Sequence, residues 1–410
     1  MADAWKESYK NRHNARSRQG HGGDNKRKNQ EDNVVEEEKK RVDDSYLQRW
    51  PQSLLKAVID ALQQPPNDAA VRSFLKKNDW PKGLIEALLR DINRVPVRFF
   101  IIDDSGSMNS KDGSFVEKGS SSSSSSKAKA KVITTTRWGE LAQAMSFHAS
   151  LAHAAEIPCE FRLLNGADPC VIGIGSKSES GDSLKFLQNV MEEPPAGQTP
   201  LCAHIRAVVN NIMSMEEMLR NNNQRAAVII ATDGEASDGD VAAALKPLEN
   251  LPAILVLRLC TNDERLLNYW NAVDSNLEVE VDVLDDLCSE ADEAQTANPW
   301  LTYPEYLHKM REFGSSLKEL DLLDESLLST EHMRAVVCNL LFDGKKSNTP
   351  NPDEDFDAFA REVRQKMDQN ITRSQTFDMV SKRYCDLIKM DKLRAKYSGD
   401  DMQSVSCVIS

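Results

Sequence analysis

Between Val95 and about residue 296, short apolar runs alternate with longer amphipathic segments. The runs at 226–231 and 253–257 contain no polar residue, which is typical of strands buried on both faces of a parallel sheet. We predict strands at 97–103, 158–164, 169–174, 226–232, 252–259 and 278–284, and helices near 137–154, 183–191, 201–220, 240–248, 262–273 and 285–296. This alternation predicts an α/β fold with a doubly wound, mainly parallel six-stranded sheet, spanning residues 94–297.

The pattern changes on both sides of this region. Residues 1–44 are charged and contain few apolar positions, so we expect a disordered tail. Residues 45–93 contain a repeat in which Trp50-Pro51 and Trp80-Pro81 each open an amphipathic segment, which predicts a small helical module. We predict a helical extension at 298–370 and, within 371–410, a C-terminal helix near Phe377–Lys396 followed by a tail.

A low-complexity segment interrupts the α/β region at 109–135. It includes seven consecutive serines at 120–126. Such a sequence is typical of a flexible surface insertion. The alternative interpretation is a lid or a phosphorylated regulator, because the segment directly follows a candidate binding loop.

Composition narrows the function classes. The net charge of -13 gives no electrostatic reason to bind nucleic acid, so we expect no nucleic-acid partner. The N-terminal residues lack the apolar stretch of a secretory signal, and no apolar run is long enough to span a membrane. The eight cysteines are scattered without a Cys-x-x-Cys pair, which favours buried free thiols and a cytoplasmic location.

Hydroxyl and carboxylate side chains gather in three short stretches. These are Asp-Asp-Ser-Gly-Ser at 103–107, Gly-Gln-Thr-Pro at 197–200 and Thr-Asp-Gly at 232–234. Because the carboxyl ends of parallel strands meet at one edge of a sheet, we expect one oxygen-rich site there. Its residues are Asp103, Ser105, Ser107, Thr199 and Asp233. Hard oxygen ligands favour Mg²⁺, with Mn²⁺ or Ca²⁺ as alternatives, and a cation would relieve the repulsion between the carboxylates.

The three stretches, in this order, resemble the metal-ion-dependent adhesion site (MIDAS) of the von Willebrand factor type A (vWA) domain. The resemblance covers roughly residues 94–290 and implies a Rossmann-like vWA fold with an intact site. It implies that Ser105 and Ser107 bind the metal directly and that Thr199 binds it directly or through water. It also implies that Asp103 and Asp233 act mainly through water, and that a carboxylate of a protein partner completes the coordination.

Some features depart from the family pattern. Asp104, the serine-rich insertion and the Glu192-Glu193 pair are additions, and we expect the acids to make the rim of the site more negative. The Trp-Pro repeat, the helix start at Arg137–Leu141 and the segment Asn298–Leu301 resemble an intracellular vWA family of microbial eukaryotes. That second resemblance implies no activity.

The last four residues, Cys407 to Ser410, match the Cys-aliphatic-aliphatic-X signal for prenylation. A lipid on Cys407, with the basic residues upstream, would tether the protein to an anionic membrane surface. The alternatives are therefore a lipid-anchored, membrane-associated protein and a chance tetrapeptide.

No catalytic pattern accompanies the oxygen-rich site. Ser105 does not stand in a Gly-x-Ser-x-Gly turn, and no base is placed for it. We therefore expect a non-enzymatic, divalent-cation-dependent protein-binding module. One alternative is a regulatory subunit of an ATPase or ubiquitin-type assembly; the other is a structural domain stabilised by its metal.

Overall fold

The centre of the molecule is a six-stranded sheet. A computed structural model describes residues 50–118, 130–166, 168–261, 263–275, 277–315, 317–342, 344, 349–369 and 375–398. The strands are β1 (Val97–Ile102), β4 (Cys159–Leu163), β5 (Cys170–Ile172), β6 (Ala226–Thr232), β7 (Ala253–Leu259) and β8 (Val281–Leu284). All six lie within the ranges predicted from the sequence.

The order of the strands fixes where a binding site can form. The sheet runs β5-β4-β1-β6-β7-β8, and only the β4–β5 pair is antiparallel. Numbered along the chain, this is the 3-2-1-4-5-6 order of doubly wound sheets, whose winding reverses between β1 and β6. Ile102 pairs with Ala231, so the loops after these two strands emerge side by side at that crevice. The predicted α/β fold class is confirmed.

Both faces of the sheet are apolar. In β1, Phe100 and Ile102 join the core on one face, whereas Val97, Phe99 and Ile101 join the core on the other. This explains why the strand appears in the sequence as an apolar run, interrupted by the buried Arg98. The first face is covered by α6 (Arg137–Ala155), α7 (Lys177–Met191) and α12 (Leu287–Ala297).

The second face is covered by α8 (Leu201–Met213), α9 (Glu216–Asn221), α10 (Val241–Leu245), the 3-10 helix η3 (Lys246–Asn250) and α11 (Glu264–Asp274). The single helix predicted at 201–220 is therefore two helices. The chain breaks at Ser214 and Met215, and the buried Met215 side chain joins the second core.

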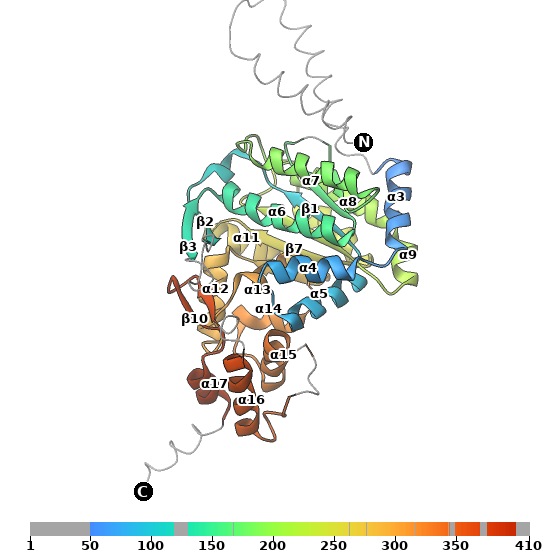
Figure 1. Ribbon diagram of the computed structural model, residues 1–410. Coiled ribbons are helices and arrows are strands. Elements are labelled where there is room, and N and C mark those ends of the chain that lie inside the picture. The colour runs from blue at the N-terminus through green and yellow to red at the C-terminus, as the bar shows by residue number, and fades with distance from the viewer. Residues whose placement is uncertain are drawn as a thin grey trace, which may run out of the picture.

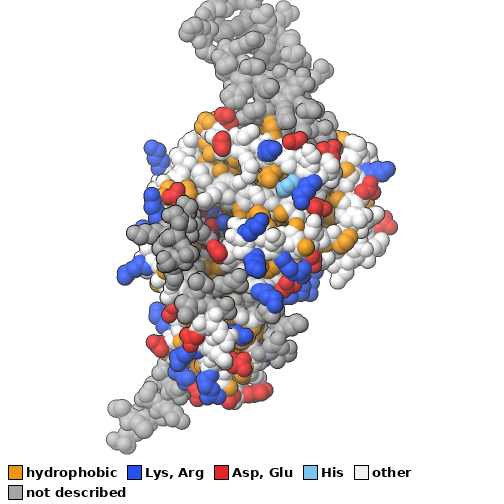
Figure 2. Space-filling view, viewed as in Figure 1, with side chains coloured by type: hydrophobic (Ala, Val, Ile, Leu, Met, Phe, Trp, Pro, Cys, Tyr) orange, Lys and Arg blue, Asp and Glu red, His pale blue; other side chains and the backbone are white. Residues whose placement is uncertain are grey.

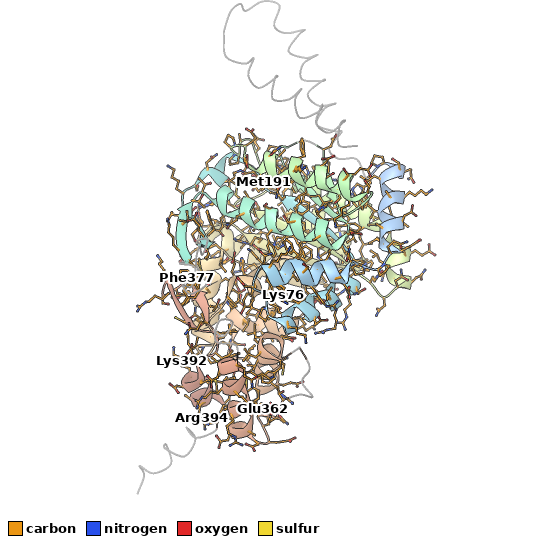
Figure 3. The ribbon with its side chains drawn as sticks, in the orientation of Figure 1. Lys76, Met191, Glu362, Phe377, Lys392 and Arg394 are labelled. Carbon is orange, nitrogen blue, oxygen red and sulfur yellow. The ribbon has the colours of Figure 1, made fainter. Side chains whose placement is uncertain are left out.

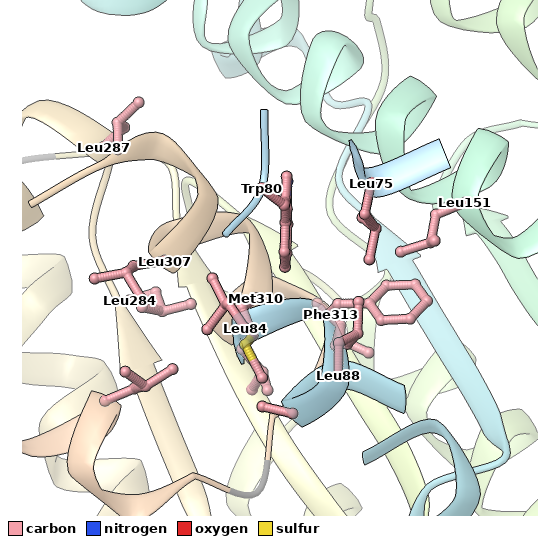
Figure 4. Packing of buried hydrophobic residues seen from close by; sticks show 14 of the residues in the cluster. Leu75, Trp80, Leu84, Leu88, Leu151, Leu284, Leu287, Leu307, Met310 and Phe313 are labelled. Carbon is pink, nitrogen blue, oxygen red and sulfur yellow. The ribbon is translucent and has the colours of Figure 1, made fainter. Parts of the chain in front are cut away.

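The N-terminal segment predicted to be helical forms α3 (Gln52–Leu62), α4 (Asp68–Lys77) and α5 (Lys82–Arg94), which pack against the sheet. Trp50 stacks on Phe99 of the second face, with ring centroids 5.3 Å apart. Trp80 instead lies on the first face, where it packs near Leu84 of α5 and Met310 (Figure 4). The two copies of the repeat therefore cover opposite faces, and α3 lies apart from α4 and α5 in Figure 1.

The ends of the predicted flexible insertion are ordered. β2 (Gly113–Lys118) and β3 (Ala130–Thr135) pair as an antiparallel hairpin at the left of Figure 1, after the short 3-10 helix η2 (Gly106–Asn109). The Arg137 N–H donates to the Ser110 carbonyl (2.9 Å), and the Ser114 N–H donates to Glu140 (2.8 Å). The hairpin is thus fastened to the start of α6. The serine run lies outside the described residues.

The C-terminal extension continues the first core with α13 (Glu305–Glu312), α14 (Lys318–Glu325), α15 (Thr330–Leu341) and α16 (Phe356–Gln369). The sequence did not predict α14. The helix predicted at Phe377–Lys396 is wrong in its first half, which forms the hairpin β9 (Gln375–Asp378) and β10 (Arg383–Asp386) before α17 (Met390–Tyr397). Phe377 and Tyr384 are cross-strand partners in edge contact, which stabilises the hairpin over a helix.

Some predictions fall outside the described residues, namely the disordered tail at 1–44 and the lipid site at Cys407. The cysteines that can be placed are free thiols, and most of them are buried. Within the described ranges, no helix has both the length and the apolar character needed to cross a membrane. Figure 3 labels Met191 near one end of the molecule and Glu362, Lys392 and Arg394 in the lobe at the other. The loop that follows α7 is thus remote from α16 and α17.

Candidate metal site

Asp103 is the innermost residue of the oxygen-rich site. It follows β1 directly, and its N–H donates to the Ala231 carbonyl of β6 (2.9 Å). Its side chain is fully buried; one carboxylate oxygen accepts from the Ser105 N–H (2.9 Å) and the other from the Thr232 hydroxyl (2.6 Å). Two neighbouring strands therefore fix this carboxylate.

The remaining predicted residues surround the same point. The Ser105 and Ser107 hydroxyl oxygens are 3.0 Å apart, and the Ser107 hydroxyl donates to Asp233 Oδ1 (2.6 Å). Thr199 Oγ1 lies 3.9 Å from the position of a Cβ on Gly234, next to Asp233. The structure thus brings all five predicted residues together. Ligands about 2.1 Å from Mg²⁺ lie about 3 Å apart along an octahedral edge, so the spacing of the two serines suits this ion.

Backbone contacts and an extra acid hold the Thr199 loop. The Gly106 N–H donates to the Gly197 carbonyl (3.2 Å), and the Ala196 N–H donates to the Asp104 carbonyl (2.8 Å). The Asp104 carboxylate accepts from both the backbone and the amide nitrogen of Asn165, and that amide also donates to the Gln198 carbonyl (2.7 Å).

Asp104 therefore does not add to the negative rim as we expected. Its carboxyl group is buried beneath the loops, and burial raises its pKa to about 6. The structure assigns Asp104 to positioning the loop that carries Thr199. Glu192 and Glu193 are exposed, as expected for rim residues.

The charge balance at the site favours a cation. Burial raises the pKa of Asp103, and the neighbouring charge of Asp233 raises it further, while the hydrogen bonds from Thr232 and Ser105 lower it. No basic side chain among the described residues forms an ion pair with Asp103. A buried carboxylate without a counter-charge is unfavourable, so the donor set fits a hard divalent cation. Across the described ranges, no cluster of three or more His, Cys, Asp or Glu side chains forms a metal-binding group, so the hydroxyls would be needed.

Arg137 is the residue of the site that sequence reasoning missed. Its Nη1 lies 2.9 Å from Asp233 Oδ2, and its Nε lies 2.8 Å from Asp112 Oδ1. The hydrogen bond between Arg137 and Asp112 raises the pKa of the arginine and lowers that of the acid. The available signal was Thr136, a helix N-cap that places the next side chain at the edge of the sheet.

Comparisons with known proteins show only a distant structural similarity. No family model matches the chain, and no curated protein matches it. Among solved structures, the crystal structure of the SpRpn10 VWA domain is similar to it, with 12% sequence identity and a TM-score of 0.28. That similarity covers 47% of this chain and 88% of the SpRpn10 chain. Because these values are so low, we infer nothing about partners from the likeness.

Proposed function

We propose that this chain is a non-catalytic, divalent-cation-dependent module that binds a protein partner. The observation that carries the proposal is the convergence of five oxygen-bearing side chains at the carboxyl edge of β1 and β6. This is the crevice in which doubly wound sheets bind ligands. Three separate loops supply the oxygens, and hydrogen bonds between the loops hold them in place.

Mg²⁺ is the cation that best suits this donor set. Ser105 and Ser107 would bind it directly, Thr199 directly or through water, and Asp103 and Asp233 would supply the balancing charge. Asp103 is fully buried whereas Ser107 is exposed, so a bound ion would have protein on one side and solvent on the other. Mg²⁺ retains part of its water shell, and a carboxylate of a partner can replace one of these waters.

A binding role is favoured over a hydrolytic one. The Ser105 hydroxyl contacts Ser107 rather than a base, and the buried histidines His148 and His204 contact other partners, Glu312 and the Leu164 carbonyl. A nucleic-acid partner is not favoured either. Over the described part of the face shown in Figure 2, acidic and basic side chains are interspersed, whereas nucleic-acid binding needs a basic patch or stripe.

Calorimetric titration of Mg²⁺ into the purified chain tests this proposal. We expect saturable binding by the wild type and a loss of about 10- to 100-fold in affinity for Asp233→Ala. Glu235→Gln is the matched control, because it removes an exposed acid two residues away and is expected to leave binding nearly unchanged. Equal affinity of the wild type and Asp233→Ala would remove the basis for the site.

A cation with a purely structural role is the competing proposal, since the site residues already hold one another through hydrogen bonds. The two are separated by adding a synthetic acidic peptide. A binding module takes up the peptide only when Mg²⁺ is present. A structural metal raises the melting temperature but leaves the chain unable to take up the peptide. A regulatory role in an ATPase or ubiquitin-type assembly requires the same binding activity and is distinguished by its partner.

A further inference from the structure

We propose that Arg137 is an internal counter-cation that competes with the divalent cation for Asp233 and thereby sets the cation affinity of the site. This inference rests on the proposed function and goes beyond it, because it names the residue that tunes the site. Arg137 is not one of the five metal-site residues and lies more than 25 positions from each of them in the sequence.

The contacts of Asp233 show why the two cations would compete. Its side chain is fully buried, and both carboxylate oxygens are engaged: Oδ1 by the Ser107 hydroxyl (2.6 Å) and Oδ2 by Arg137 Nη1 (2.9 Å). A metal bound to Ser107 would share this carboxylate with the guanidinium. The two positive charges would then lie on opposite oxygens of one acid.

The repulsion between these two charges is strong because Arg137 and Asp233 are sheltered from solvent. The Arg137 side chain is only 16% exposed, and charges sheltered from solvent are screened little by salt. Binding of the metal therefore weakens the pair of Arg137 with Asp233, and the pair weakens binding of the metal by the same factor.

Asp112 keeps the arginine in this position. It binds Nε at 2.8 Å and Nη2 at 2.5 Å, forming a two-pronged contact at the turn before β2. Arg137 can thus remain charged and anchored while its bond to Asp233 is lost. The site then has two states: one with Asp233 neutralised by Arg137 and one with Asp233 facing the metal.

The two acids of the site consequently have different roles. Asp103 forms no ion pair with any described residue, so the metal supplies its counter-charge, whereas Asp233 has Arg137 when the metal is absent. Arg137 therefore holds the site in shape when no cation is bound, and it lowers the affinity of the site for the cation.

Titrations of Mg²⁺ and Mn²⁺ into single variants test the inference. We expect Arg137→Gln to bind either ion roughly five- to tenfold more tightly than the wild type, because one nearby positive charge is removed. Arg137→Lys keeps the charge and should stay within about twofold of the wild type. Lys111→Gln is the matched control, because it removes an exposed positive charge next to Asp112 in the sequence and should also change affinity by less than about twofold. Equal or weaker binding by Arg137→Gln would overturn the inference.

A second measurement uses the wild type and does not depend on the variants folding. The Nε–H resonance of Arg137 is followed by NMR while Mg²⁺ is added; it should shift in proportion to saturation, and the shift should reverse with chelator. A resonance that does not respond while the metal binds would contradict the inference. If the wild type binds no metal at all, the proposed function fails instead, so the two failures are distinguishable.

Discussion

Single carboxylates in this protein differ mainly in what balances their charge. Asp233 has Arg137, and Glu312 lies between Arg258 Nε (2.9 Å) and His148 Nε2 (3.1 Å). Asp103 has only hydrogen-bond donors. Buried carboxylates without a counter-charge, such as Asp103, are common at functional sites, where a ligand supplies the missing charge.

Asp285 provides a test of charge burial away from the site. Burial, followed by the charges of Glu293 and Asp286, raises its pKa to about 6. Because the folded-state pKa lies above the ordinary value near 4, the contribution of this acid to stability declines as the pH rises from about 4 to about 6.

We therefore expect Asp285→Asn to be more stable than the wild type at pH 8, by about 1 kcal/mol after allowing for solvent screening. The two proteins should be equally stable at pH 4. Chemical denaturation across this pH range measures the difference, and Asp292→Asn, at an exposed position on the following helix α12, is the control. A constant difference at all pH values would show that the charge of Asp285 is not its cause.

Residue types and spacing were enough to predict the five residues of the candidate site. They did not predict Arg137 or the role of Asp104. The sequence places Arg137 beyond a long insertion, and its contact with Asp233 depends on how the start of α6 packs against the loop after β6. Asp104 is adjacent to the site in sequence, but its side chain points to Asn165, and the sequence carries no sign of that direction.

At the scale of elements, the loop between α7 and α8 depends on Gly197. Its φ is +115°, and a Cβ at this position would come within 2.4 Å of Asn165 Oδ1. Only glycine adopts this backbone conformation without strain, and Asn165 is fixed by Asp104. The position of Thr199 thus follows from a glycine two residues earlier.

We expect Gly197→Ala to weaken Mg²⁺ binding at least about tenfold and to destabilise the fold by roughly 1–3 kcal/mol. Gly181→Ala is the control. Gly181 lies within α7, where alanine favours the helix, and its Cβ would make only an ordinary contact, 3.6 Å from His153 of α6. Calorimetry and thermal melting of both variants are the measurements. Unchanged metal affinity in Gly197→Ala would show that the loop does not position Thr199.

The elements that the sequence predicted best are those whose formation depends on burial. Central strands such as β6 are buried at every position because both faces are covered, and β6 is apolar up to its last residue, Thr232. The two hairpins were missed because cross-strand pairing stabilises them rather than apolar periodicity. The turn between β9 and β10 contains Lys382 with φ +55°. Lysine seldom adopts this conformation, so the local sequence did not predict the turn.

At the scale of the whole molecule, the C-terminal extension and the sheet share one core. Trp300 is fully buried in the same cluster as Phe100 of β1. The Lys389 N–H donates to the Trp300 carbonyl (2.7 Å), and a bridge joins Leu301 to Ile388. The extension is therefore expected to unfold together with the sheet.

Trp300→Ala should lower stability by about 3–5 kcal/mol and shift a single unfolding transition. Val380→Ala, at a position that is 43% exposed, is the control and should change stability by less than about 0.5 kcal/mol. Differential scanning calorimetry distinguishes the outcomes. A new early transition in Trp300→Ala, with the main one unchanged, would mean that the extension unfolds on its own.

The most direct test of the central claim is anomalous X-ray diffraction from crystals of the chain grown with Mn²⁺. The account predicts one strong anomalous peak between the Ser105 and Ser107 hydroxyls, close to Thr199 and on the solvent side of Asp103. The peak should be absent from crystals of Asp233→Ala grown under the same conditions. The lack of a peak at these serines in the wild type, or a peak only elsewhere, would contradict the claim that this edge of the sheet is a divalent-cation site.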